Sequence, residues 1–151
     1  MIRLDKVSYQ IETSAGAVQV LRDIDLELPD GSISAIVGPN GSGKTTLARL
    51  VSGLLRPTSG NVHLLSNDDI HTAKDVRPGV DVGLVFQNPD NQLVATTVED
   101  DIAFGLENLQ LPHAEMVRRV EDVLRLLGLQ LFRDYPPHRL SGGQKQKVAI
   151  A

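Results

Sequence analysis

The sequence predicts an α/β fold in which antiparallel strands come first, a phosphate-binding loop follows, and helices make up the later part. The pattern G-x-x-x-x-G-K-[ST] of such loops is matched by Gly38-Pro39-Asn40-Gly41-Ser42-Gly43-Lys44-Thr45-Thr46. Before the loop, apolar and polar residues alternate over 24–28, which is typical of an antiparallel strand with one face in water. After residue 97, apolar residues recur at helical spacing.

Several strands are expected before the loop. Residues 2–11 alternate loosely, and the short runs 18–21 and 24–28 are typical of two further strands. Residues 29–31 (Pro-Asp-Gly) have the composition of a turn. The run 32–37 is apolar and β-branched, so we expect a buried strand that leads directly into the glycine loop.

The loop contains the residue types that polyphosphate binding requires. Gly38, Gly41 and Gly43 allow backbone conformations and close approaches that a Cβ would block. Backbone N–H groups and the positive end of the following helix dipole then favour an anion. Lys44 adds a cation for the β- and γ-phosphates, and the Thr45 hydroxyl is placed to bind Mg²⁺. A chance glycine-rich turn is the alternative, but the flanking strand and helix favour a phosphate-binding loop.

The helix that begins near Lys44 is expected to end at Gly53, because glycine is common at helix C-termini. A strand over 61–65 and a polar loop over 66–81 follow. Residues 82–86 are expected to form a second buried strand, which ends at Gln87.

Helices are expected over the rest of the chain. Thr97 with Asp100 makes a capping pattern, Pro112 can open the next helix, and Gly128 can end it. A final element begins at Ser141. The apolar residues expected to face the core are Val98, Ile102, Leu106 and Leu109 in one helix, and Met116, Val117, Val120, Val123, Leu124 and Leu127 in the next.

Composition excludes several classes of protein. The formal net charge of −4 argues against a broad nucleic-acid-binding surface. The absence of cysteine excludes a disulfide framework and a thiolate metal site. The N-terminus has no apolar signal segment, and no apolar run approaches the length of a membrane span. We therefore expect a cytoplasmic chain that reaches a membrane only through a partner.

A second glycine motif, Leu140-Ser141-Gly142-Gly143-Gln144, has two interpretations. Ser141 with Gln144 fits a capping box that opens a helix. Alternatively, glycine N–H groups at a helix N-terminus form a second anion site. Both interpretations remain open from the residues alone.

Together the motifs resemble those of ATP-binding cassette (ABC) ATPases. Residues 38–46 resemble the Walker A loop, residues 140–144 resemble the signature motif, and Gln87 resembles the Q-loop glutamine. The stretches 87–93 (QNPDNQL) and 97–105 (TVEDDIAFG) resemble the ATPase subunits of energy-coupling factor (ECF) transporters, which take up vitamins and transition-metal ions.

The resemblance implies a P-loop NTPase core of the ABC type within residues 1–151. Residues 1–87 would form the antiparallel β subdomain and the P-loop core, 88–140 a helical subdomain, and 141–151 the signature helix. ATP would be held by Gly38, Pro39, Asn40, Gly41, Ser42, Gly43, Lys44, Thr45 and Thr46. Thr45 and Gln87 would meet Mg²⁺. The γ-phosphate on a partner subunit would be touched by Leu140, Ser141, Gly142, Gly143 and Gln144.

The resemblance also implies partners. A second ABC ATPase subunit, identical or related, would pair head to tail with this one, and ATP would join the two. A transmembrane coupling protein and a substrate-binding membrane subunit would place the chain at the cytoplasmic face of the membrane, with no nucleic acid involved. A soluble non-transport ABC ATPase and a catalytically silent nucleotide-binding fragment are the alternatives.

The chain departs from the family pattern in two ways. The aromatic that usually stacks on adenine falls at Ile11, so either Tyr9 substitutes or Ile11 gives only apolar contact. The family's Asp-Glu strand end and switch histidine are not found, so this chain contains no catalytic base and is expected to be the N-terminal part of a longer protein, with exposed apolar strand edges and marginal stability.

Possible substitutes for the missing catalytic residues have simpler interpretations. Residues 99–101 (Glu-Asp-Asp) are acidic, but they fall in the first turn of a predicted helix, where acids favour the dipole. The histidines are interpreted as surface or loop residues; they are His63, His71, His113 and His138.

Overall fold

The computed structural model describes residues 1–66, 69–72, 78 and 81–151. The chain divides into two compact units, residues 1–84 and residues 85–151. Within the described ranges, no helix has both the length and the apolar character needed to span a membrane. The subdomain boundaries expected from the resemblance stay a prediction.

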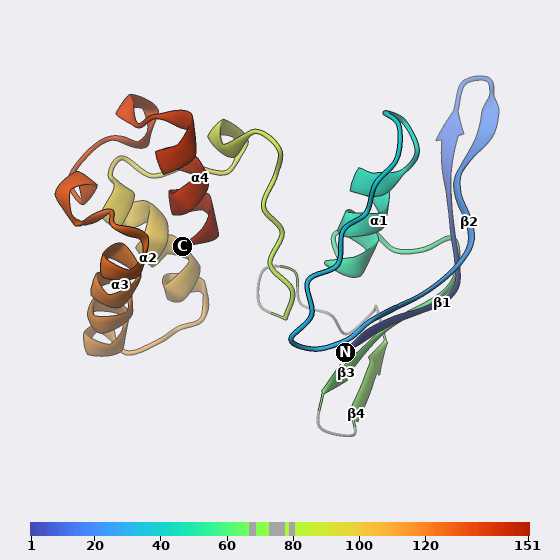
Figure 1. Ribbon diagram of the computed structural model, residues 1–151, viewed down its shortest axis with the longest axis horizontal. Coiled ribbons are helices and arrows are strands. Elements are labelled where there is room, and N and C mark those ends of the chain that lie inside the picture. Colours follow the sequence, from blue (N-terminus) through green and yellow to red (C-terminus); the bar gives the residue numbers. More distant parts are fainter. Residues whose placement is uncertain (67–68, 73–77, 79–80) are drawn as a thin grey trace. The chain divides into compact units, whose positions relative to one another are not determined.

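The first unit is built on an antiparallel sheet with the strand order β2-β1-β3-β4 (Figure 1). Its strands are β1 (Ile2–Thr13), β2 (Gly16–Leu28), β3 (Ser59–Ser66) and β4 (Asp69–Thr72). β1 pairs with both β2 and β3, so that Leu4 lies opposite Leu26 on one side and Val62 on the other. The expected antiparallel segment before the glycine loop is therefore confirmed.

Two details of this sheet differ from the sequence prediction. The two strands expected over 18–21 and 24–28 form one continuous strand, because Asp23 takes a left-handed conformation (φ 46°) at a bulge and the pairing resumes beyond it. The Ser8 hydroxyl accepts a hydrogen bond from the Asp23 N–H at 2.9 Å and holds the bulge. Residues 69–72 form β4 where a loop was expected; within that expected loop, 67–68, 73–77 and 79–80 lie outside the described residues.

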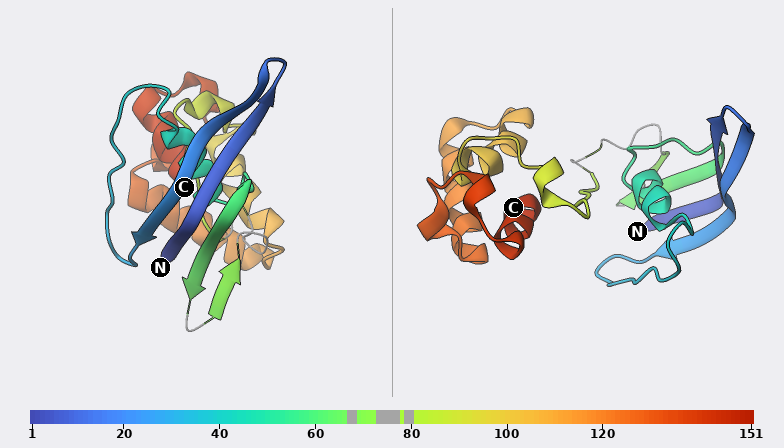
Figure 2. Two further views of the ribbon diagram at one scale, coloured as in Figure 1. Left: turned by 90° about the vertical axis from the view of Figure 1, so that its right-hand side faces the viewer. Right: turned by 90° about the horizontal axis from the view of Figure 1, so that it is seen from above.

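Helix α1 (Lys44–Val51) packs against one face of the sheet (Figure 2). Its buried residues, Leu47 and Leu50, join an apolar cluster with Leu21 of β2. The other buried members of the cluster are Leu4, Val7 and Val62. The helix ends one residue earlier than expected, at a C-cap formed by Ser52, and Gly53 follows with φ 75°. This packing fixes the direction in which the helix N-terminus points.

The two expected buried strands are not present. Residues 32–37 form no strand, and Ile33 and Val37 are 102% and 88% exposed. Residues 83–86 also lie outside any strand, and Val82 makes only an isolated bridge to Pro78. A strand exists only where a neighbour accepts and donates its backbone hydrogen bonds, and no described strand pairs with either run. Apolar residues of both runs are exposed, but they are not strand edges, so the exposed edges expected at these two runs are not observed and the expected marginal stability stays a prediction.

The second unit is helical, and its helix boundaries agree with the sequence prediction. Its helices are α2 (Val98–Asn108), α3 (His113–Leu127) and α4 (Gly142–Ile150), with short 3₁₀ helices η1 (Pro89–Asn91), η2 (Gln130–Phe132) and η3 (Pro137–Arg139). The Thr97 side chain caps α2 by accepting from the Asp100 N–H, Pro112 precedes α3, and Gly128 ends it at φ 67°.

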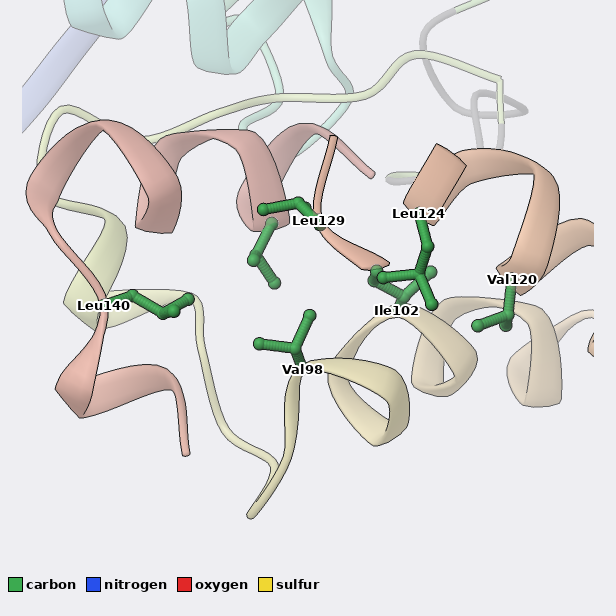
Figure 3. Packing of buried hydrophobic residues seen from close by; sticks show 7 residues of the cluster. Val98, Ile102, Val120, Leu124, Leu129 and Leu140 are labelled. Carbon is green, nitrogen blue, oxygen red and sulfur yellow. The ribbon is translucent and has the colours of Figure 1, made fainter. Parts of the chain in front are cut away.

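An apolar cluster holds these helices together (Figure 3). Its buried residues are Val98, Ile102, Val120, Leu124, Leu129, Leu140 and Val148. Val117 and Leu109, which were expected to face the core, are instead 38% and 41% exposed. Val117 lies at the margin of the apolar face of α3, and Leu109 follows the last residue of α2 as its C-cap.

The start of α2 is tied to the loop that follows η2. The N–H groups of Val98 and Glu99 donate to the carbonyls of Tyr135 and Arg133, at 3.0 and 3.1 Å. The Glu99 carboxylate also accepts from Arg133, whose Nε lies 2.7 Å from Oε2. The hydrogen bond from Arg133 lowers the pKa of Glu99. The first turn of α2 is therefore bound to this loop both by backbone hydrogen bonds and by a side-chain ion pair.

Substituting alanine for Gly60 tests the close approach of β3 to β1. Gly60 has φ 79°, and a Cβ there would lie 2.2 Å from the Lys6 carbonyl oxygen. Strain and collision together should lower the free energy of unfolding by at least about 2 kcal/mol. Chemical denaturation measures the loss. Gly83→Ala, at an open position, is the matched control, and equal stability of the two variants would contradict the packing described.

Acid titration tests the Glu99–Arg133 pair. The pKa of Glu99 is lowered from 4.5 in the folded chain, so the pair stabilises the fold above that value and its contribution is lost as the pH falls through the lower, folded pKa. The Tm difference between the unmodified chain and Glu99→Gln should therefore be largest near neutral pH and shrink below about pH 4. Glu107→Gln, at an exposed position of α2, is the control. A pH-independent difference would refute the pairing.

Candidate functional site

The C-terminal end of the glycine loop lies against the middle of strand β2. Gly43, the N-cap of α1, has φ 89°. A Cβ on Gly43 would lie 2.8 Å from Leu21 Cδ2 and 3.2 Å from the Val20 carbonyl oxygen. Gly41 also takes a left-handed conformation, with φ 82°. Glycine is therefore required at position 43 for both conformation and space.

The Lys44 side chain folds back into the loop. Its ammonium donates to the carbonyl oxygens of Gly38 at 2.9 Å and Pro39 at 2.7 Å, and it lies 3.5 Å from Ser42 Oγ. The Ser42 N–H donates to the Pro39 carbonyl at 3.3 Å. These contacts gather the loop around one positive charge.

The first turn of α1 adds backbone donors next to this charge. The first intrahelical bond runs from the Leu47 N–H to the Gly43 carbonyl at 2.8 Å, so the preceding N–H groups have no acceptor within the helix. The helix has no side-chain cap and no acidic residue in its first turn. Thr45 is exposed there. An ammonium, several N–H groups and a free hydroxyl fit a polyphosphate with its divalent cation.

The two candidates for adenine contact differ in exposure. Tyr9 is partly buried and packs against the apolar cluster of the first unit. Ile11 is 45% exposed and lies opposite Val18 of β2, which is 51% exposed. The structure thus gives Tyr9 a place in the core and leaves an apolar cross-strand pair on the surface.

The second glycine motif forms the N-terminus of α4, in the other unit. Ser141 Oγ accepts from the Gln144 N–H at 3.4 Å, and Gln144 Oε1 accepts from the Ser141 N–H at 2.8 Å. The capping box expected from the sequence is therefore confirmed. Leu140 is buried in the apolar cluster of this unit and anchors the motif.

The capping box does not exclude an anion at the same place. The backbone N–H groups of Gly142 and Gly143 lie in the first turn, where no intrahelical acceptor exists. A Cβ at either glycine would meet nothing within 4 Å among the described residues. Because Ser141 Oγ accepts from Gln144, its own proton is available to an external oxygen.

Gln87 is exposed in a compact loop of the same unit. Gln92 Oε1 accepts from the Phe86 N–H at 2.7 Å, and Asn88 Oδ1 accepts from the Asp90 N–H at 3.0 Å. The structure thus gathers the Walker A residues in one unit and places Gln87 and the signature residues in the other. The sequence analysis did not predict that the side chains of Asn88 and Gln92 close this loop with hydrogen bonds. Pro89 and the Asn/Gln content of the segment are the signals that could have indicated it.

The acidic residues 99–101 make structural contacts at the start of α2. Glu99 pairs with Arg133, Asp101 Oδ1 accepts from the N–H groups of Val94 and Ala95 at 2.8 Å each, and Asp100 takes part in the α2 cap. Among the described residues, no three His, Asp or Glu side chains gather as a metal site would require. The run therefore acts as a helix start, as expected.

The histidines fit the sequence prediction only in part. His113 and His138 are exposed. The prediction that His63 is a surface or loop residue is wrong. His63 lies in β3, its side chain is largely buried, and its Nε2 is 3.1 Å from Asp5 Oδ2. Strand pairing with β1 brings it there, which the spacing of histidines does not reveal. The side chain of His71 lies outside the described part.

Comparison with known proteins gives consistent results. The family model for ABC transporters matches residues 21–151. The ECF transporter ATP-binding protein EcfA1 of Halalkalibacterium halodurans is 53% identical over 98% of this chain and 52% of its own length. EcfA1 of Caldanaerobacter subterraneus is 49% identical over the whole chain and 55% of its own length. The chain spans about half the length of the curated relatives it matches.

Solved structures show the same relationship. CbiO1 from Clostridium perfringens, part of the ABC transporter complex CbiONQ, is 35% identical with a TM-score of 0.77 over 99% of this chain and 59% of its own. The dimeric ABC transporter cassette MJ0796 is 28% identical with a TM-score of 0.83, over 99% of this chain and 67% of its own. On the family match, the chain belongs to the ABC transporter family, and over about half of their length it is similar to ATP-binding proteins of ECF transporters.

Proposed function

We propose that this chain supplies the ATP-binding part of an ECF-type importer, in which ATP binding and hydrolysis at a head-to-tail pair of ATPases drive uptake of a vitamin or a transition-metal ion. The observation that carries the proposal is the Lys44 ammonium held on the carbonyls of Gly38 and Pro39, at the open N-terminus of α1. The similarity to EcfA1 proteins supports the transport assignment.

Residues 38–46 hold the phosphates in this proposal. The amides of the first turn and Lys44 neutralise the β- and γ-phosphates, and the Thr45 hydroxyl is one oxygen ligand of Mg²⁺. Gln87 is the second proposed Mg²⁺ ligand, an assignment that depends on the family resemblance. Bound ATP supplies a phosphoanhydride bond whose hydrolysis releases the energy for transport.

Adenine rests on an apolar surface rather than on an aromatic ring. The exposed pair Ile11 and Val18 provides that surface, because Tyr9 is already packed in the core. Gly43 contacts Leu21 of β2. Val18 lies three residues before Leu21, a distance of about 10 Å along a strand. Base and phosphates would thus bind along one strand.

A second ATPase subunit completes the site. Ser141 and the N–H groups of Gly142 and Gly143 contact the γ-phosphate held by the P-loop of that partner, and its own signature motif does the same here. The dimeric state of the MJ0796 cassette bound to ADP and Pi supports such pairing. The partner is identical or a related ATPase.

Membrane subunits receive the resulting motion. We assign the helical unit to contact with a transmembrane coupling protein, which acts with a substrate-binding membrane subunit. The chain would work at the cytoplasmic face of the membrane and bind no nucleic acid. CbiO1, described as part of the CbiONQ complex, supports this arrangement.

Replacing Lys44 tests the nucleotide site. Lys44→Ala removes the ammonium that the loop surrounds, so ATP affinity should fall at least about 100-fold, measured by titration of the native protein with Mg-ATP. Arg49→Ala removes an exposed positive charge from the same helix and should leave the affinity unchanged. Equal affinities of both variants and the unmodified protein would refute the assignment. Turnover measured in parallel separates an ATPase from a silent binder.

An exchange experiment tests the shared site. Gly142→Asp places a carboxylate where it favours the α4 dipole but repels a phosphate, so folding should persist while ATPase activity is lost. If the active dimer contains two copies of this chain, mixing it with inactive Lys44→Ala protein should restore activity, because the mixed dimer keeps one intact site. If the partner is a related ATPase, each variant should abolish a different site.

Gly142→Asn is the control for size without charge. It should retain more activity than Gly142→Asp, because it introduces no repulsion. Full activity of Gly142→Asp in the native assembly would contradict phosphate contact at this glycine.

A further inference from the structure

An ion pair connects the loop around Gln87 to the signature helix. Lys145 Nζ of α4 lies 2.6 Å from Asp90 Oδ1 of η1. The Lys145 side chain is only 15% exposed, whereas Asp90 is 57% exposed. The Lys145 side chain is therefore largely covered along its length, in contrast to the Arg118–Asp122 pair along α3, in which both side chains are more than half exposed.

The Asp90 end of the pair belongs to a closed loop. Gln92 reaches back to the Phe86 N–H, directly before Gln87, and Asn88 accepts from the Asp90 N–H. The N–H groups of Asn91 and Gln92 donate to the carbonyls of Asn88 and Pro89 at 3.2 and 2.9 Å. Residues 86–92 are therefore held together by their own hydrogen bonds. A displacement of Asp90 should consequently move Gln87 with it.

The Lys145 end belongs to the first turn and a half of α4. The Lys145 N–H donates to the Ser141 carbonyl at 2.9 Å, so one helical hydrogen bond separates the lysine from the capping serine. Farther along the helix, Lys147 Nζ donates to the Leu127 carbonyl at 2.9 Å. Lys145 thus holds the N-terminal end of α4 on the Gln87 loop, and Lys147 holds the later part on α3.

We infer that Asp90 and Lys145 are positioning residues that make the Gln87 loop and the signature motif move as one body. This inference depends on the proposed function, in which Gln87 responds to nucleotide on its own subunit and Ser141 contacts nucleotide on the partner. The ion pair then transmits the state of one nucleotide site to the other, without touching ATP itself. Its loss should affect turnover and leave binding at the P-loop intact.

Kinetics of the native ATPase assembly distinguish positioning from simple stabilisation. Asp90→Asn and Lys145→Met should each lower kcat at least about 5-fold, while KM and the Kd for Mg-ATP stay within about 2-fold. The double variant should be no slower than the slower single variant, because both changes remove one interaction. Lys145→Arg keeps the charge and should retain kcat within about 2-fold.

Asp122→Asn is the matched control, because it breaks an exposed pair with Arg118 in the same unit and should leave kcat unchanged. Unchanged kcat in Asp90→Asn overturns the inference, as does a fall in kcat that is additive in the double variant or accompanied by a matching loss of ATP affinity. If Lys145→Met does not fold, Asp90→Asn and Lys145→Arg decide the matter. Absence of ATP binding in the unmodified assembly overturns the proposed function and the inference together.

Discussion

The contact between Gly43 and strand β2 determines the geometry of the proposed nucleotide site. With no side chain at position 43, the loop reaches the Leu21 side chain and the Val20 carbonyl directly. The same Leu21 packs with Leu47 and Leu50 of α1, so burial of the helix and placement of the loop depend on one apolar cluster. The hydrophobic free energy of that cluster therefore orients the N–H groups of the first turn, and the carbonyls of Gly38 and Pro39 hold the Lys44 ammonium beside them.

Features with local causes could be predicted from the sequence. The capping of α2 by Thr97 and of α4 by Ser141, and the left-handed end of α3 at Gly128, each involve residues within four positions of one another. The β1–β2 hairpin follows from alternation and a short connection. The glycine loop belongs to the same class, because its turn, its glycines and its lysine are consecutive in the chain.

Features with distant causes could not be predicted. The runs 32–37 and 82–86 have the composition of buried strands, but composition does not supply a neighbouring strand, and both remain outside the described sheet. His63 is buried by pairing with β1, and Lys145 by contact with Asp90, which lies 55 residues earlier. Polar and charged residues are usually interpreted as solvated until a partner is known, so neither pair could be predicted.

The two glycine motifs differ in a way that suits two different tasks. Helix α1 has no side-chain cap, and its first-turn donors and Lys44 are all directed to one loop, which favours tight capture of phosphate. Helix α4 satisfies part of its N-terminus internally, since Gln144 and Ser141 bond each other, and the first basic residue within the helix, Lys145, is paired with Asp90. Its remaining donors are the two glycine amides and the Ser141 proton. In the proposed dimer, such a terminus would add affinity for an anion that another surface already holds. A strong site and a weak site of this kind, brought together by one nucleotide, would let ATP control pairing, because the weak contact forms only while the γ-phosphate is present.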